Sequence, residues 1–189
     1  MPRQLQVCNL EDWRTGGEKR NQFIQKIGDA LKDIGFFALT GHGIDVNSIK
    51  SAYKSADDFF SLDQGVKDQY ERPQMFRQRG YTPYGIEHAK DNPEPDLKEF
   101  WQTGRTLHTE HSQIDSFPKN FWPTKHVETF EADIDGLFQN LESISGELLK
   151  AAALYLQKDE NGLNEMTIDG NTILRVIHSP PLSPSPPQG

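Results

Sequence analysis

The chain has 189 residues, 28 acidic and 20 basic, and a formal net charge of −8 at pH 7. This length suits one domain with a hydrophobic core, so an enzyme is not excluded, whereas the negative charge disfavours binding to the phosphate backbone of nucleic acids. No apolar run approaches the roughly 18 residues of a membrane span, and residues 1–10 lack a signal-peptide pattern. The single cysteine, Cys8, excludes an internal disulfide framework and a multi-cysteine zinc site. We therefore expect a cytoplasmic protein that binds neither nucleic acid nor membrane.

Hydrophobic periodicity predicts the secondary structure. Apolar residues at three- and four-residue steps indicate amphipathic helices, while short runs rich in β-branched and aromatic residues indicate strands. Glycines and polar turn residues mark where elements end. In chain order the predicted elements are a helix over Glu18–Ile34, a strand over Phe36–Thr40, a helix from Asp45 or Asn47 to Phe60, a short helix around Val66–Tyr70, one long helix or two in series between Val127 and Tyr155, and a strand over Thr172–Ile177.

Two regions depart from this regular pattern. Prolines are scattered among aromatic and charged residues from Glu71 to Asn120, so this region predicts ordered loops and short strands. The strand over Thr172–Ile177 has nothing after it to pair with, because the prolines between His178 and Gly189 preclude a continued ladder. Domains rarely leave the unpaired N–H and C=O groups of a strand edge open. We therefore expect part of a sheet to be missing from this chain.

The turn Gly41-His42-Gly43 follows a predicted strand and invites comparison with a dinucleotide-binding loop. Val46 stands where the third glycine of G-x-G-x-x-G is needed, so the motif is incomplete. The favoured interpretation is a tight strand-to-helix turn in which both glycines supply backbone conformations closed to other residues and His42 hydrogen-bonds the loop.

His108 and Glu110 form an H-x-E pair, which is one allowed form of the ligand pair in a two-histidine, one-carboxylate iron centre. His126 or His178 is the candidate third ligand. The surrounding stretch is polar and loop-like, whereas metal ligands need a rigid support, so a solvated loop is the favoured interpretation.

Carboxylates gather in one other region and prolines at the C-terminus. Glu87-His88 with Asp96, Lys98 and Glu99 nearby offers groups for acid–base chemistry, although such clusters are more often a solvated or salt-bridged face. Pro181–Pro184 and Pro184–Pro187 each satisfy P-x-x-P, a pattern that polyproline-binding domains recognise and that is frequent by chance in proline-rich tails.

A series of motifs in a fixed order is a more specific indication of function than any of the single motifs above. The motifs are Asp33–Ile44, Phe59-Phe60-Ser61-Leu62, Lys67, Arg79–Pro83 with Gly85 and Glu87, Asp96–Phe100, and Asn171–Pro181. Together they resemble the N-terminal region of the isopenicillin N synthase-like family of iron(II) and 2-oxoglutarate-dependent dioxygenases. The last motif is similar to the first strand of the family's catalytic barrel.

The resemblance implies an α+β fold in three parts. Residues 1–125 form the helix-rich N-terminal region, 126–170 a helical segment that supports the barrel, and 171–189 only the first strand of a double-stranded β-helix, or jelly roll, with a proline-rich end. In the family, an H-x-D…H triad holds iron and an Arg-x-Ser element grips 2-oxoglutarate, and both follow the point matched by Pro180-Pro181. The resemblance therefore assigns no catalytic, cofactor-binding or metal-binding residue here. It implies Fe(II) and 2-oxoglutarate for the full-length family, with neither bound tightly by this chain. Ser179 departs from the family, whose members often carry a tyrosine there.

Three functions compete at this point. The first is the N-terminal half of an oxygenase acting on a small organic substrate, inactive alone and marginally stable without the rest of its barrel. The second is a non-catalytic interaction module that contacts a partner, such as a separate chain supplying the barrel, through the aromatic Tyr81–Trp101 region or the proline tail. The third and weakest is a metal site built on His108 and Glu110.

Overall fold

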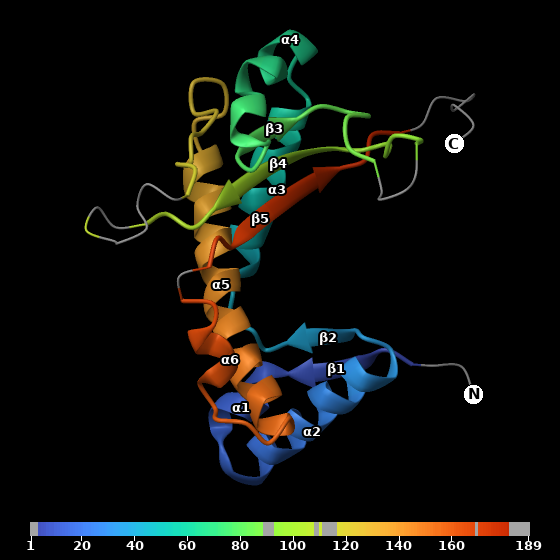
Figure 1. Cartoon of the computed structure of the whole chain (residues 1–189), viewed down its shortest axis with the longest axis vertical. Coiled ribbons are helices and arrows are strands. Elements are labelled where there is room, and N and C mark those ends of the chain that lie inside the picture. The colour runs from blue at the N-terminus through green and yellow to red at the C-terminus, as the bar shows by residue number, and fades with distance from the viewer. Residues whose placement is uncertain (1–3, 89–92, 108–109, 111–116, 169, 182–189) are drawn as a thin grey trace. The chain divides into compact units, whose positions relative to one another are not determined.

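A computed structural model describes residues 4–88, 93–107, 110, 117–168 and 170–181 (Figure 1). The chain forms two compact units, Met1–Asp45 with Gln139–Gly170, and Val46–Phe138 with Asn171–Gly189. Helix α5 (Phe130–Tyr155) contributes residues to both units. None of the helices in the described ranges combines the length and the apolar character needed to span a bilayer.

The first unit packs helices against a two-stranded parallel sheet. Strands β1 (Gln6–Asn9) and β2 (Phe37–Thr40) pair so that Cys8 lies opposite Leu39, and Cys8 is fully buried. Burial raises the pKa of the Cys8 thiol. The core combines Phe23 and Ile27 of helix α2 (Gly17–Asp33) with Ile144 and other residues of α5. The elements of this unit are β1 (Gln6–Asn9), α1 (Leu10–Thr15), α2 (Gly17–Asp33), β2 (Phe37–Thr40), the C-terminal part of α5, and α6 (Gly162–Glu165).

The Gly41-His42-Gly43 turn of this unit has the predicted structural role. Gly41 and Gly43 have φ angles of +62° and +82°, a region that favours glycine. The backbone N–H of Ile44 donates to Nδ1 of His42 at 3.1 Å, so the histidine closes the loop. The interpretation of this segment as a turn is confirmed.

The second unit contains a three-stranded antiparallel sheet in the order β3 (Gly80–Thr82), β4 (Glu99–Gly104) and β5 (Ile173–His178). Figure 1 shows the three strands side by side, with β5 at the edge. The register places Gln102 of β4 between Gly80 and Arg175, and Trp101 between Tyr81 and Val176. The elements of this unit are α3 (Val46–Phe60), α4 (Gln64–Lys67), the 3₁₀ turns η1 (Asp68–Tyr70) and η2 (Pro73–Met75), β3 (Gly80–Thr82), β4 (Glu99–Gly104), the N-terminal part of α5, and β5 (Ile173–His178).

One face of this sheet packs against α3 and α5 through aromatic rings. Trp101 and Tyr81 are fully buried, and the ring of Phe59 lies 5.0 Å from that of Trp101 and 5.7 Å from that of Tyr81, in edge-on geometry. Phe130 completes the cluster at 5.1 Å from Trp101. Because successive side chains of a strand point to opposite faces, the neighbours of Trp101 in β4 must point away from this core.

The longer predicted elements are confirmed, and α5 is one continuous helix. The short elements β1, α1 and α6 were missed. The prediction that the last strand is unpaired is wrong on one edge, because all six residues of β5 pair with β4. The partner comes from earlier in the chain, in the proline-interrupted region, and not from a segment that follows. Within the described residues, no strand pairs with the other edge of β5.

Gly80 should be intolerant of substitution. It has a φ of +82°, and a Cβ atom there would lie 2.5 Å from the carbonyl oxygen of Tyr70 and would overlap the ring of Phe121. We expect Gly80→Ala to lower the free energy of unfolding by about 2–4 kcal/mol, from left-handed strain plus overpacking. Urea denaturation measures the change.

Gly136→Ala is the matched control. Gly136 lies inside α5, and a Cβ atom there meets nothing within 4 Å. This substitution should raise the free energy of unfolding by up to about 1 kcal/mol through helix propensity. Equal effects of the two substitutions would contradict the steric account of Gly80.

Candidate functional site

The face of the sheet opposite the aromatic core borders a cavity of about 550 Å³. The register places Thr82 opposite Phe100 and Gln102 opposite Arg175. Phe100 and Gln102 are two residues apart in β4, so all four side chains lie on this face. Loops before and after β3 form the rest of the wall. The lining residues are Phe76, Arg77, Gln78, Thr82, Ile86, Glu87, His88, Phe100, Gln102, Asn171, Ile173 and Arg175.

Arg175 is the central charged group of this cavity. Its guanidinium lies over the ring of Phe100, 4.3 Å from the centroid. Nη1 donates to both carboxylate oxygens of Glu87, at 3.0 and 3.2 Å, while Nε and Nη2 donate to Oε1 of Gln102 at 3.3 and 3.2 Å. The arginine is therefore fixed on three sides and its charge is paired.

The other charges at the cavity are paired as well. Lys98 bridges Glu87 and Asp96, at 3.0 and 2.8 Å. Arg77 donates to Oε1 of Glu71 through Nε and Nη2, at 2.9 and 2.8 Å. These are partly exposed ion pairs, which contribute little to stability individually but set the local charge.

The carboxylate of Glu99 is buried on the other face of the sheet, the one that packs against the helices. Oε2 of Glu99 accepts from Nζ of Lys67 at 2.8 Å and from the hydroxyl of Tyr81, and Oε1 pairs with Nδ1 of His178 at 2.8 Å. The side chains of Lys67 and Glu99 are only 8% and 5% exposed. His178 also stacks on the ring of Phe60, with centroids 5.0 Å apart.

This network shifts the pKa values of its members. Burial by itself would raise the pKa of the Glu99 carboxyl, but hydrogen bonds from Lys67, Tyr81 and His178 outweigh burial and hold it below its usual range. Burial and the hydrogen bond to Glu99 raise the pKa of Tyr81. Glu99 is therefore ionised at neutral pH and serves as the acceptor of the whole network.

The structure separates residues that the sequence grouped together. Glu99 lies on the helix-packed face, whereas Glu87 and Asp96 interact on the cavity side, so the three carboxylates do not form one acid–base cluster. Tyr81 and Trp101 are fully buried and offer no contact surface to a partner. Neither Arg175 nor Gln102 was predicted from the sequence as a candidate site residue. The available signal was the single cationic residue, Arg175, in an otherwise apolar strand.

The candidate metal ligands are dispersed or lie outside the described ranges. Nδ1 of His126 lies 2.7 Å from the hydroxyl of Tyr70, and His178 is engaged by Glu99. His108 lies outside the described residues, as do residues 182–189 with the P-x-x-P motifs that end there. Among the residues that the structure describes, no group of three or more histidine, cysteine, aspartate or glutamate side chains could hold a metal ion. The described side chains therefore do not fit an iron centre.

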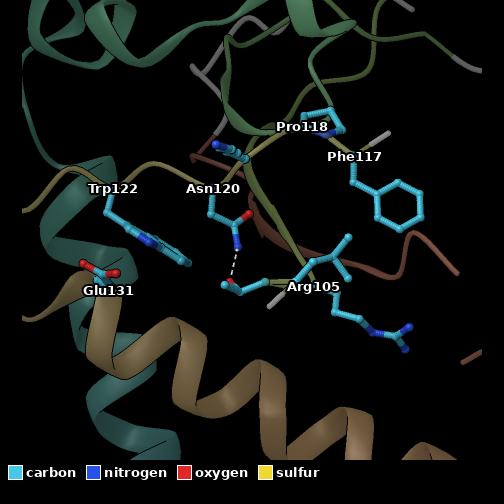
Figure 2. Close-up of a pocket in the computed structure, with 9 residues that line it drawn as sticks. Arg105, Phe117, Pro118, Asn120, Trp122 and Glu131 are labelled. Carbon is cyan, nitrogen blue, oxygen red and sulfur yellow. Dashed lines mark hydrogen bonds between the residues drawn. The ribbon is translucent and has the colours of Figure 1, made fainter. Parts of the chain in front are cut away.

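A second cavity of about 570 Å³ lies where the chain leaves β4 (Figure 2). Asn120 closes its base by exchanging two hydrogen bonds with the backbone of Gly104, at 2.6 and 3.0 Å. Figure 2 shows Trp122 and Glu131 at one end and Phe117 and Arg105 at the other. These side chains come mostly from loops, which position groups less accurately than strands do, so the sheet cavity is the stronger candidate.

A known family model matches most of this chain. The model is described as non-haem dioxygenase in morphine synthesis N-terminal, and it matches residues 5–125. The chain belongs to this family. The resemblance drawn from the motifs is therefore confirmed.

The chain is similar to two solved structures and to a curated dioxygenase. A putative 2OG-Fe(II) oxygenase family protein from Caulobacter crescentus is 31% identical, with a TM-score of 0.82, over 94% of this chain and 57% of that one. A full-length Neurospora crassa protein, solved in complex with alpha-KG, shares the fold at 21% identity, with a TM-score of 0.76, over 93% of this chain and 54% of that one. The 2-oxoglutarate-dependent dioxygenase ucsF of an Acremonium species is 25% identical over 93% of this chain and 55% of its own length. The chain thus spans about half the length of such relatives.

Removing one partner of the buried pair should be costly. Lys67→Met leaves the Glu99 carboxylate buried without its cation, and we expect a loss of about 3–5 kcal/mol in the free energy of unfolding. Urea denaturation followed by tryptophan fluorescence measures it. Lys54→Met is the control, because Lys54 pairs with Asp58 in solvent, and it should leave the unfolding midpoint unchanged. A loss below about 1 kcal/mol for Lys67→Met would show that the network is not structural.

The same network predicts a component of acid sensitivity. Because the folded state lowers the pKa of Glu99, its contribution is complete above the ordinary glutamate pKa of about 4.3 and is lost as the pH falls from there through the folded-state pKa. The stability difference between the wild type and Glu99→Gln should be constant from about pH 7 to 5 and shrink toward about pH 3. Denaturation curves across this range measure it, with Glu128→Gln on the surface as control. A difference that does not vary with pH would refute the assignment.

Proposed function

We propose that this chain forms the N-terminal, substrate-side part of an iron(II)- and 2-oxoglutarate-dependent oxygenase that acts on a small organic substrate. The family match supports the reaction class, and relatives described as 2-oxoglutarate-dependent dioxygenases support the cosubstrate. The observation that carries the proposal is the polar cavity on the face of the β3-β4-β5 sheet that points away from the aromatic core.

The sheet supports the proposal through its asymmetry. One face is closed by the aromatic core, while the other presents Arg175, Gln102 and Phe100 to the cavity. In this proposal β5 is the first strand of the jelly roll, and the next barrel strand adds to its outer edge. Ile177 lies on the cavity face and is 54% exposed, as expected of a side chain that further barrel strands would cover.

The proposed division of labour follows from the side chains present. The cavity residues bind and orient the substrate, and the Glu99 network holds the sheet in register. The iron ligands and the arginine for 2-oxoglutarate are supplied from outside these 189 residues, either by a continuation of the polypeptide or by a separate chain that completes the barrel. The division of the chain into an N-terminal region (1–125), a helical segment that supports the barrel (126–170) and the first barrel strand with the proline-rich end (171–189) is part of the same proposal.

A turnover assay tests this division. The purified 189-residue protein, given Fe(II), ascorbate and 2-oxoglutarate, should release CO₂ no faster than a protein-free control. Iron content is measured in parallel. Stoichiometric iron together with 2-oxoglutarate turnover would contradict the proposal that the catalytic groups lie outside this chain.

The nucleotide sequence after codon 189 provides the second arm of this test. Read in all three frames, it should encode H-x-D, a later histidine and Arg-x-Ser if the polypeptide continues into the barrel. A long unrelated region would instead favour a separate chain, which co-purification would then identify.

A further inference from the structure

We infer that the sheet cavity selects uncharged substrates bearing a carboxamide or similar donor–acceptor group and rejects carboxylates. This inference rests on the proposed function, since it takes the cavity to be the substrate site. It concerns the substrate class, which neither the family nor the relatives specify for this chain.

Arg175 is already paired with a carboxylate of the protein, that of Glu87. An arginine in a binding cavity ordinarily binds a carboxylate through two parallel hydrogen bonds. Here Glu87 is already the carboxylate partner, with both of its oxygens within 3.2 Å of Nη1, and Nε and Nη2 donate to Gln102. A carboxylate ligand would have to displace Glu87 or lie beside it, and like charges side by side are costly.

The other arginine that lines the wall, Arg77, is paired too, while Arg79 is only 1% exposed, does not line the cavity and donates to Oδ1 of Asn171 at 2.9 Å. Arg77 is engaged by Glu71 through two donors, and Lys98 behind the wall is shared between Glu87 and Asp96. The charges of these arginine and lysine side chains therefore cancel in pairs. Binding a neutral ligand leaves these pairs intact, whereas binding an anion adds a charge that neither arginine of the cavity lining can pair with unless it gives up its carboxylate.

The remaining polar wall consists largely of primary amides. Oε1 of Gln102 already accepts from Arg175, and Oδ1 of Asn171 accepts from Nη2 of Arg79 at 2.9 Å. A ligand can use the N–H groups and lone pairs that remain on Gln102, Gln78 and Asn171. Nδ2 of Asn171 donates to Oε1 of Gln78 at 3.0 Å, and Gln102 donates to the carbonyl of Arg77, so these amides are held in place before a ligand arrives. Preorganised amides match a carboxamide or lactam, which pairs donor to acceptor without net charge.

The apolar part of the wall suits a ring. Phe100 is only 2% exposed beneath Arg175, so the apolar surface open to a ligand comes from Ile86 and Ile173, which line the same cavity and are 47% and 37% exposed. Apolar surface beside amides favours a cyclic ligand that carries the polar group. The inferred ligand is therefore a small cyclic amide or an aromatic carboxamide.

Matched probes of nearly the same shape, in which a carboxamide replaces a carboxylate, test the inference. Benzamide against benzoate, and nicotinamide against nicotinate, are titrated into the 189-residue protein and followed by ligand-observed NMR. We expect each amide to bind at least about tenfold more tightly than its carboxylate. The reason is that a bound carboxylate would place a second negative charge beside Glu87, and this repulsion costs more free energy than a tenfold difference in affinity represents.

Substitution at Glu87 should reverse the preference. Glu87→Gln leaves Arg175 without its carboxylate, so the carboxylate probes should gain at least about tenfold in affinity. The double variant Glu87→Gln/Arg175→Gln should lose that gain. Glu131→Gln, which makes the same change of charge in the second cavity, should leave the ratio as in the wild type.

Each outcome bears on either the inference or the proposed function. Carboxylates binding the wild type as tightly as amides would overturn the inference while leaving the cavity as a small-molecule site. Binding of neither class would overturn the cavity as the substrate site and the inference with it. The wild-type ratio decides the question even if a Glu87 variant fails to fold.

Discussion

The buried carboxylate of Glu99 is the constraint on which the second unit depends. An ionised group at 5% exposure is tolerable only when donors surround it, and here they come from three separate elements, α4, β3 and β5. Satisfying Glu99 therefore requires Lys67, Tyr81 and His178 to converge on the first residue of β4. A shift of any one of these elements would remove one of the three partners of the buried carboxylate.

This convergence also fixes the register of the sheet. Since the side-chain period of a strand is two, a slip of one residue would exchange the two faces completely. With Glu99 and Trp101 held against the helices, Phe100 and Gln102 must face the cavity, and the pairing of β4 with β5 places Arg175 beside them. The geometry of the candidate site is thus a consequence of the network on the other side of the sheet.

The sequence predicted the long elements well, because α2, α3 and α5 each repeat an apolar stripe over several turns. It missed β1, whose four residues are too short for a periodic signal. It grouped Glu99 with Glu87 and Asp96 by closeness in sequence, although alternation along β4 turns Glu99 to the other face. The site around Arg175 could not be predicted, since it depends on a register between strands far apart in the chain, and local pattern carries no information on such pairing.

The two faces use charge in different ways. The Lys67–Glu99 pair is desolvated, so changing either partner disturbs the folded state, and this face has little freedom to vary. The Arg175–Glu87 pair is about one third exposed, and Glu87 lies on a loop, so its replacement changes the charge of the cavity at small cost in stability. A sheet whose register is held by one face can therefore have the ligand preference of its other face altered by substitutions in the loop, with the core unchanged. Under the proposed function, the polarity of the cavity wall, set by loop residues such as Glu87, determines which substrates this scaffold accepts.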